Sequence, residues 1–369
     1  MANVGKLAAV FFSHCIEITQ SSNRSNGDFF IPDCNVNHDG ETCNGEGYVN
    51  TKDSSPAIKM VSLCLKNLVY SRFMKRQVIM SIIIPFSIWL VGCQEKKQPV
   101  VLVGFAAGKR LAELDSKKLE EVSGLAASIN NPGLLWTQND SGNGAEIFLI
   151  DQKTKIKQTY ILNGVKNRDW EDIAVGSGPD PLRHYLYVAE IGDNLALYRY
   201  KTIYRFEEPL LSPNEKTIRI TQFDTITFEL SDTKRDAEAI LLDPKTKDLY
   251  IFSKSNDPSD VYQLTYPYAT KDTSIAKQAG SLPINRIVAA DFSRQGDEIL
   301  IKNYNHVYYW KNDGSKSVMQ LLQEPAREIP YEQEPQGEAI AWAADGSGFY
   351  TLSERVQGKK TYLYYYQRK

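Results

Sequence analysis

Cysteine and histidine are almost missing from the larger part of this 369-residue chain. All five cysteines lie at or before Cys93, and residues 94–369 contain only His184 and His306. This part therefore has no disulfide, and it cannot supply the sulfur and imidazole ligands of a typical zinc site. A Ser-His-Asp triad would need one of the two histidines. Neither stands in a recognisable motif, so we expect both to be structural or at the surface.

An excess of charge of one sign is also lacking. The chain has 43 lysines and arginines against 45 aspartates and glutamates, a net charge of −2, and no long basic run. Nucleic-acid-binding proteins carry a basic patch or stripe, so this class is excluded. Methionine is scarce, with 5 residues, whereas the 21 tyrosines favour strands over helices. The composition predicts an all-β domain.

A short apolar run follows a basic start near residue 74. Met74 to Gln77 (MKRQ) precede the apolar stretch 78–91, which is too short to span a bilayer comfortably and is typical of a secretory signal. The segment Leu90 to Cys93 (LVGC) resembles the lipobox of bacterial lipoproteins. That resemblance implies cleavage before Cys93, which then carries the lipid. The alternative is a buried core segment with an incidental cysteine.

These features divide the chain into four parts. Residues 1–73 are a mis-assigned or disordered N-terminal extension, because they show no clear hydrophobic period. Residues 74–92 form the signal peptide, residues 93–99 a linker after the lipidated cysteine, and residues 100–369 the folded domain. We expect this domain outside the cytoplasm, attached to a membrane by its lipid alone, with the outer membrane favoured.

The folded domain contains an internal repeat. Three segments align without gaps, and their first residues, Glu238, Val288 and Glu338, are spaced by 50 positions. Looser copies begin at Ser123 and Glu171. Each copy contains a strand of small residues, a turn and two or three further strands, which is the signature of a β-propeller. Five blades are favoured and six are possible, and the alternative fold is an irregular β-sandwich.

The last copy lacks a fourth strand, while the segment Val100–Phe105 precedes the first copy and has no other place to pair. Closure of the ring would remove the exposed edges that an open array leaves. We therefore expect Val100–Phe105 to close the ring.

Glutamate opens the first strand in three of the five copies, at Glu171, Glu238 and Glu338. Equivalent positions of a propeller converge on one end of the central channel. Three carboxylates there would repel one another unless they share a proton or bind a cation. Ligands that offer oxygen alone suit calcium better than zinc, so we expect calcium.

Charged residues flank two of these glutamates in the repeated pattern Arg-Asp-x-Glu, at Arg168 with Asp169 and at Arg235 with Asp236. They could orient the glutamates or hold an anionic ligand through bidentate contacts. They could equally pair from blade to blade and line no site.

Two further acids, Asp140 and Asp193, follow second strands on the same face. A ligand-binding role is possible for both, but turn chemistry alone explains an aspartate at such positions.

Three blade openings carry a family resemblance: residues 121–126 (EVSGLA), 169–174 (DWEDIA) and 336–341 (QGEAIA). They resemble those of the SdiA-regulated and phytase-like propeller proteins of bacteria, over roughly residues 100–369. The resemblance implies a five-bladed propeller with bound calcium, distantly akin to NHL repeats. Gluconolactonase and paraoxonase-type propellers resemble the chain more distantly. They place metal ligands at the positions that match Glu171, Glu238 and Glu338. Val288 and Ser123 depart from that pattern, and the paired-aspartate motifs of β-propeller phytases are missing.

Three functions remain open. The first is a monomeric envelope module that binds calcium centrally and a small ligand or an envelope protein on its loop face. The second is a calcium-dependent hydrolase of phosphoesters or lactones, in which the metal polarises the scissile group. The third is a scaffold whose glutamates only form hydrogen bonds between blades.

Overall fold

The computed structural model describes residues 34–37, 40–43, 104–256 and 258–369. The chain forms two units, Met1–Lys97 and Gln98–Lys369. In the first unit, β1 (Cys34–Asn37) and β2 (Gly40–Cys43) pair as an antiparallel hairpin. The expected signal peptide, Cys93 and the linker lie outside the described residues. Within the described ranges, no helix has the length and apolar character needed to cross a membrane.

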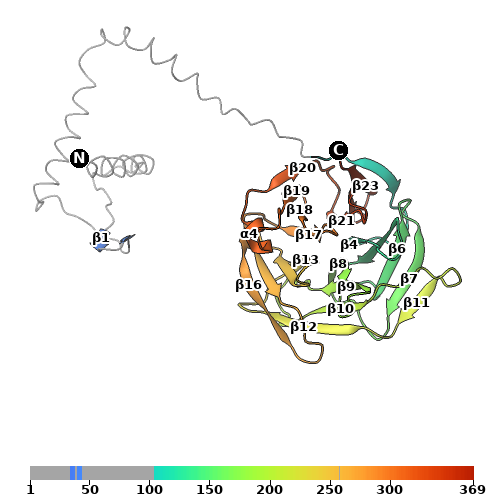
Figure 1. Ribbon diagram of the computed structural model, residues 1–369, viewed down its shortest axis with the longest axis horizontal. Helices are drawn as coiled ribbons and strands as arrows, with labels where there is room; N and C mark the ends of the chain where they lie inside the picture. Colours follow the sequence, from blue (N-terminus) through green and yellow to red (C-terminus); the bar gives the residue numbers. More distant parts are fainter. Residues whose placement is uncertain (1–33, 38–39, 44–103, 257) are drawn as a thin grey trace, which may run out of the picture. The chain divides into compact units, whose positions relative to one another are not determined.

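The second unit is built from antiparallel strands that follow one another along the chain (Figure 1). The first sheet contains β4 (Val122–Ala127), β5 (Leu134–Asn139), β6 (Glu146–Asp151) and β7 (Ile156–Leu162), and β11 (Thr217–Ile220) adds to it by pairing in parallel with β7.

Next along the chain is an eight-stranded sheet made of two groups of four strands. One group is β8 (Trp170–Ser177), β9 (His184–Glu190), β10 (Lys201–Glu207) and β12 (Asp224–Leu230). The other is β13 (Ala237–Leu242), β14 (Leu249–Ser253), β15 (Ser259–Leu264) and β16 (Ser274–Leu282). The two groups are joined by a short parallel pairing between the outer strands β12 and β16.

Two four-stranded sheets complete the unit. One contains β17 (Ile287–Phe292), β18 (Glu298–Asn303), β19 (Val307–Lys311) and β20 (Arg327–Ile329), with the short helix α4 (Val318–Leu322) before β20. The other contains β21 (Gly337–Trp342), β22 (Gly348–Ser353), β23 (Tyr362–Gln367) and, from the N-terminal side, β3 (Lys109–Glu113).

The first strand of each repeat lies innermost. β4 contacts β8, β8 contacts β13, β13 contacts β17, β17 contacts β21, and β21 contacts β4 again. Figure 1 shows these strands around the centre, with later strands of each group further out. The innermost strands are almost wholly buried and rich in alanine, because bulky side chains do not fit where strands crowd together. The prediction of an all-β, propeller-like fold is confirmed.

The strand that pairs with β23 lies later in the chain than expected. β3 pairs antiparallel with β23, from Glu113 opposite Tyr362 to Lys109 opposite Tyr365. Of the expected Val100–Phe105, only residues 104 and 105 are described, and Phe105 makes a single bridge with Arg368. The Phe105 ring is buried among aromatic rings instead, with centroids 5.2 Å from Phe349 and 5.9 Å from Trp342. Phe105 is thus a core residue at the end of this sheet.

Candidate functional site: a carboxylate cluster at the starts of the innermost strands

A β-bulge occurs at the same place in all five innermost strands. The pairing of each first strand with its second strand skips one residue near the start of the first strand. A bulge re-aims the side chain of the residue that it leaves unpaired. The skipped residues are Ser123, Glu171, Glu238, Val288 and Glu338. These are the repeat-opening positions recognised in the sequence, so the bulge gives them a common structural setting.

Glu171 belongs to two groups of carboxylates that could hold a metal ion. One group is Asp140, Asp169 and Glu171, and the other is Glu171, Asp236 and Glu238. In each group the three residues offer oxygens that lie within 4.8 Å of one another, and neither group includes histidine or cysteine. Glu171 and Glu238 are each only 2% exposed. The structure therefore brings together acids from three repeats, and two of these acids, Glu171 and Glu238, lie at bulges. We call these five residues the carboxylate cluster.

Gly192 allows the chain to pass close beside this cluster. A Cβ atom at this position would clash with Oε1 of Glu171 and would lie 2.5 Å from Cγ of Asp169. No residue with a side chain fits there without moving both carboxylates. The glycine therefore lets the backbone after β9 form one wall of the cluster.

Four carboxylates of the cluster, those of Asp140, Asp169, Glu171 and Glu238, have raised pKa values, mainly because burial disfavours their charged forms. Burial raises the pKa of Asp140 to about 7 and that of Glu238 to about 8, although the Lys254 ammonium opposes the shift of Glu238. Burial, and then the neighbouring charge of Glu238, raise the pKa of Glu171 well above its usual range. Burial and the charge of Asp236 raise the pKa of Asp169. Without a cation, the cluster therefore retains protons near neutral pH.

Glu338 lies beside the cluster but outside both groups. Its Oε1 accepts hydrogen bonds from the Tyr304 hydroxyl at 2.5 Å and from Gln336 Nε2 at 3.5 Å. Its charge contributes to the raised pKa of Glu171. Glu354 lies next to it, and burial together with the Glu338 charge raises the pKa of Glu354 to about 9. Glu338 thus forms a second acidic pair at the same end of the innermost strands.

Three polar residues of this region were not selected as site residues from the sequence, although residues 353–355 were expected to follow a second strand on the loop face. Lys254, Tyr304 and Glu354 each come directly after the second strand of their repeat, as Asp140 does. The end of the second strand lies opposite the start of the first, so these residues neighbour the bulges. The position after the second strand was therefore the signal that could have found them.

The two arginines of the Arg-Asp-x-Glu pattern form their ion pairs outside the cluster. Arg168 Nη1 lies 3.8 Å from Glu190 Oε1, and its guanidinium stacks 4.3 Å from the centroid of the Tyr198 ring. Arg235 pairs with Asp232 at 2.8 Å and with Asp260 at 3.2 Å. The aspartates of the pattern, in contrast, belong to the cluster.

Asp193 supports a turn beside the cluster. Its backbone N–H donates to Asp236 Oδ1 at 2.7 Å, and its carboxylate accepts the N–H groups of Leu197 and Tyr198 at 2.7 and 2.8 Å. Its carboxylate oxygens are thus occupied by backbone donors. Asp193 belongs to neither of the two metal-ligand groups found among the described residues.

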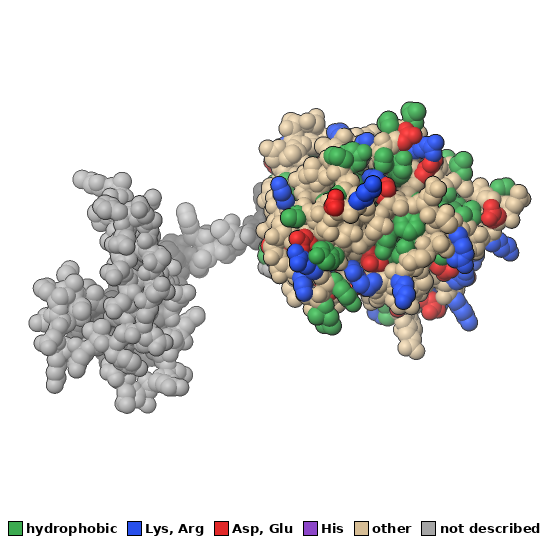
Figure 2. Space-filling model, turned by 90° about the horizontal axis from the view of Figure 1, so that it is seen from below, with side chains coloured by type: hydrophobic (Ala, Val, Ile, Leu, Met, Phe, Trp, Pro, Cys, Tyr) green, Lys and Arg blue, Asp and Glu red, His purple; other side chains and the backbone are tan. Residues whose placement is uncertain are grey.

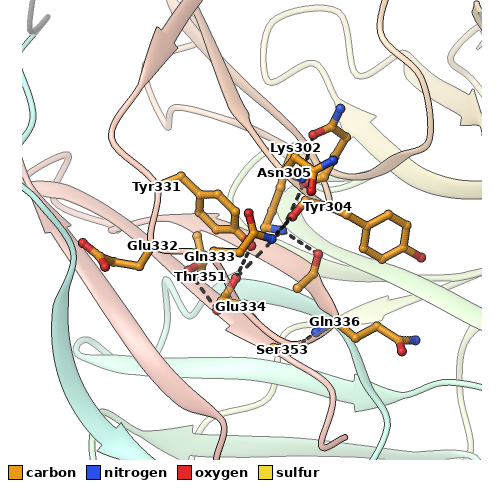
Figure 3. A network of polar contacts seen from close by, with 12 residues as sticks. Lys302, Tyr304, Asn305, Tyr331, Glu332, Gln333, Glu334, Gln336, Thr351 and Ser353 are labelled. Carbon is orange, nitrogen blue, oxygen red and sulfur yellow. Dashed lines mark hydrogen bonds and ion pairs between the residues drawn. The ribbon is translucent and has the colours of Figure 1, made fainter. Parts of the chain in front are cut away.

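A buried polar network underlies the start of β21 (Figure 3). Lys302 Nζ lies 3.8 Å from Glu334 Oε2, with both side chains fully buried. Tyr331 and Thr351 donate to the two oxygens of Glu334 at 2.9 and 3.1 Å, and Lys302 donates to the carbonyl of Gly337. Burial lowers the pKa of Lys302 to about 8 and raises that of Glu334 to about 7. This network holds the backbone immediately before Glu338.

The opposite ends of the innermost strands surround a cavity of about 190 Å³. Residues from the ends of all five innermost strands line it, together with His184 and Arg294. Asp291 lies at this cavity and accepts the N–H of Trp342 at 2.7 Å, and burial raises its pKa to about 7. The cavity is therefore separate from the carboxylate cluster, and Asp291 links two innermost strands.

Neither histidine lies in the cluster. His184 Nδ1 is 3.0 Å from Asn130 Oδ1, and His306 Nδ1 is 2.8 Å from Glu328 Oε1 at the surface.

Comparison with known proteins adds little to these observations. No protein-family model matches the chain, and no curated protein matches it. Among solved structures, a luciferin-regenerating enzyme matches with a TM-score of 0.39 and 9% sequence identity. The match covers 69% of this chain and 94% of that enzyme. The description of the fold therefore rests on the strand pairing given above.

Proposed function

We propose that this protein is an envelope-anchored, five-bladed propeller that binds a calcium ion in the carboxylate cluster. Five innermost strands that contact one another in sequence support the number of blades. The pairing of β3 with β23 supports closure of the ring by a strand from the N-terminal side. A ligand or an envelope protein then binds on the face that carries the cluster.

The observation that carries the proposal is the position of Glu171. Its carboxylate belongs to both metal-ligand groups, is almost completely buried, and accepts a hydrogen bond from Ser123 at the long distance of 3.3 Å. Several carboxylates this close repel one another, and a bound cation relieves that repulsion. Ligands that offer only oxygen, including several carboxylates, match the preference of calcium.

The proposed location rests on the sequence. The basic and apolar segment before Cys93, with the lipobox-like LVGC, supports secretion and attachment by lipid, with the outer membrane favoured. We propose a monomer, because sheets arranged in a ring leave only short outer edges, such as the three-residue strand β20, for pairing with a second chain.

Calcium titration with thermal unfolding tests the site. A cation that binds only the folded protein adds about 2.7 kcal/mol at a hundredfold excess over its dissociation constant, so the melting temperature must rise with calcium. Glu171→Gln should abolish this rise. Glu328→Gln, at an exposed carboxylate that pairs with His306, is the matched control and should keep it. A calcium response that survives in Glu171→Gln contradicts the proposal.

A calcium-dependent hydrolase of phosphoesters or lactones is the second candidate. One observation favours it: Glu354, with its pKa raised to about 9, is protonated at neutral pH and could donate a proton beside a metal. Calcium-dependent turnover of p-nitrophenyl phosphate or a simple lactone, lost in Glu354→Gln, would support this reading. Calcium binding without turnover of any of these substrates would favour the binding module over the hydrolase.

A further inference from the structure

The end of the innermost strands opposite the carboxylate cluster holds the cavity of about 190 Å³. The side of the second unit that Figure 2 shows mixes lysine and arginine with aspartate, glutamate and apolar side chains, so it does not single out a binding face. The cavity, in contrast, is a defined space. An engineered protein cavity of about 150 Å³ admits benzene, so this one has room for a ligand of about six to nine non-hydrogen atoms.

Small side chains create this cavity. Five of the residues that line it are alanines: Ala126, Ala127, Ala174, Ala343 and Ala344. Longer side chains at these positions would fill the space. Leu242 and Phe292 add further apolar surface. The larger part of the lining therefore suits the apolar body of a ligand.

Two groups of opposite charge line the same cavity. Asp291, near the end of β17, is half-buried there and accepts the Trp342 N–H at 2.7 Å. Arg294 follows three positions later, in the turn between β17 and β18, and its side chain is exposed. Among the residues that the structure describes, no ion pair includes either of them. A charge out of water is costly without a partner, so the two groups indicate a ligand that carries the complementary pair of charges.

The turn that carries Arg294 is fixed in position. Ser293 Oγ donates to Asp297 Oδ1 at 2.9 Å, and the N–H of Gly296 donates to the carbonyl of Ser293 at 2.8 Å. Gly296 has a φ of +67°, and a Cβ atom there would lie 2.7 Å from Pro244 Cγ in the preceding repeat. Glycine therefore lets the two turns pack together, and the backbone of Arg294 is in place before a ligand arrives.

His184 supplies a third polar group to the cavity. Asn130 Nδ2 donates to the carbonyl of Glu208 at 2.8 Å, so Asn130 Oδ1 remains to accept a hydrogen bond from His184 Nδ1 at 3.0 Å. In the neutral imidazole this contact leaves Nε2 as the acceptor. A ligand that donates hydrogen bonds, such as an ammonium group, matches this nitrogen as well as Asp291.

We propose that this cavity binds a small zwitterion, an α-amino acid with an apolar side chain. The ammonium group of the ligand pairs with Asp291, its carboxylate pairs with Arg294, and its side chain lies against the alanines. This inference depends neither on calcium nor on the lipid anchor. It can therefore fail while the proposed function stands, and the proposed function can fail while the inference stands.

Three probes of similar shape separate the contributions of the two charges. L-Leucine carries both charges, 3-methylbutylamine lacks the carboxylate, and 4-methylpentanoate lacks the ammonium group. Burial raises the pKa of Asp291 to about 7, so titration calorimetry at pH 8 keeps its carboxylate ionised. We expect leucine to bind at least about tenfold more tightly than either analogue, because each analogue lacks one charge-assisted contact. Equal binding of the three probes, or no binding of leucine at millimolar concentration, overturns the proposal.

Two variants test whether leucine binds in the cavity. Arg294→Ala, at an exposed side chain, should fold and should bind leucine and 3-methylbutylamine equally. Ala344→Leu, at a half-buried lining position, should block all three probes, and thermal unfolding checks that this variant is folded. Arg327→Ala, at an exposed arginine of β20, is the matched control and should bind leucine as the wild type does. Leucine binding that is unchanged in Arg294→Ala places the ligand elsewhere and refutes the inference.

Discussion

Lys254 Nζ lies 2.7 Å from Glu238 Oε1, so one glutamate of the carboxylate cluster has its own counter-ion. Burial lowers the pKa of Lys254, but the negative charge of Glu238 outweighs this effect and raises it overall. Glu171 has no such partner among the described residues and accepts only the Ser123 hydroxyl at 3.3 Å. The two glutamates therefore differ in their dependence on an added cation.

Removal of the Lys254 charge should destabilise the protein in the absence of calcium. Lys254→Met leaves Glu238 buried without its counter-ion, and breaking a buried pair in this way costs about 3–5 kcal/mol. Calcium should recover part of the loss by replacing the missing positive charge. Urea unfolding with and without calcium measures both effects.

The matched control for this change is Lys155→Met, which removes an exposed lysine that pairs with Asp115. Surface pairs contribute about 0–1 kcal/mol, so little change is expected. Equal losses in the two variants would contradict a special role for Lys254.

The close passage of the chain at Gly192 predicts a strong effect of one added methyl group. In Gly192→Ala the Cβ must displace the carboxylates of Glu171 and Asp169, so calcium affinity should fall at least about tenfold and stability by about 1–3 kcal/mol. Gly144→Ala is the control, because its nearest contact with a new Cβ is 3.4 Å, from a flexible glutamate side chain. Isothermal titration with calcium compares the two. Unchanged affinity in Gly192→Ala would show that the cation does not bind between these carboxylates.

The raised pKa values predict how stability depends on pH without calcium. Unfolded carboxyl groups ionise near pH 4, whereas burial raises the pKa of Glu238 to about 8 and of Glu354 to about 9 in the folded protein. Between these limits the folded state binds more protons than the unfolded state, so stability falls as the pH rises. The melting temperature of the calcium-free protein should therefore decrease from about pH 5 to pH 9.

Calcium should flatten that pH dependence, because it binds the ionised carboxylates and releases their protons. Thermal unfolding across this pH range, with calcium or with a chelator, gives the comparison. Parallel curves under the two conditions would mean that calcium and the protons do not compete for the same groups.

The buried ion pair of Lys302 and Glu334, next to the start of β21, predicts a large coupling energy between these two residues. Lys302→Met leaves Glu334 buried without its cation and should cost about 3–5 kcal/mol, as should Glu334→Gln, which leaves Lys302 uncompensated. The double variant should lose much less than the sum of the two, because no unpaired charge remains. A double-mutant cycle from chemical denaturation measures this coupling, and simple additivity would refute it.

Much of the fold could be predicted from the sequence, because each copy of the repeat places similar residue types at equivalent structural positions. Alanines at the first strand and an acid before them recur at Glu238 and Glu338, and they mark positions that the structure places innermost, each at a bulge. The strand from the N-terminal side was expected at Val100–Phe105 but pairs at Lys109–Glu113. The earlier segment was chosen because it had no other place to pair, whereas Phe105 packs in the core.

The composition of the site was only partly accessible. Asp169 and Asp236 were recognised as neighbours of the glutamates, but which acids lie within ligand distance of one another depends on contacts between repeats. Lys254, Tyr304 and Glu354 differ in residue type and share only their position directly after the second strand of their repeat. Their approach to the bulges follows from the antiparallel pairing of second and first strands.

The order of residues thus settled the strand pattern, the repeat, the candidate acids and the absence of sulfur and imidazole ligands, because these depend on local chemistry and periodicity. Packing of the repeats around one another settled the rest: the two carboxylate groups that share Glu171, the counter-ion of Glu238 and the separation of the cluster from the cavity at the far end. The physical reason is that the curvature and register of the packed strands set the distances between side chains of different repeats. Neither the curvature nor the register can be deduced from the spacing of residues along the chain.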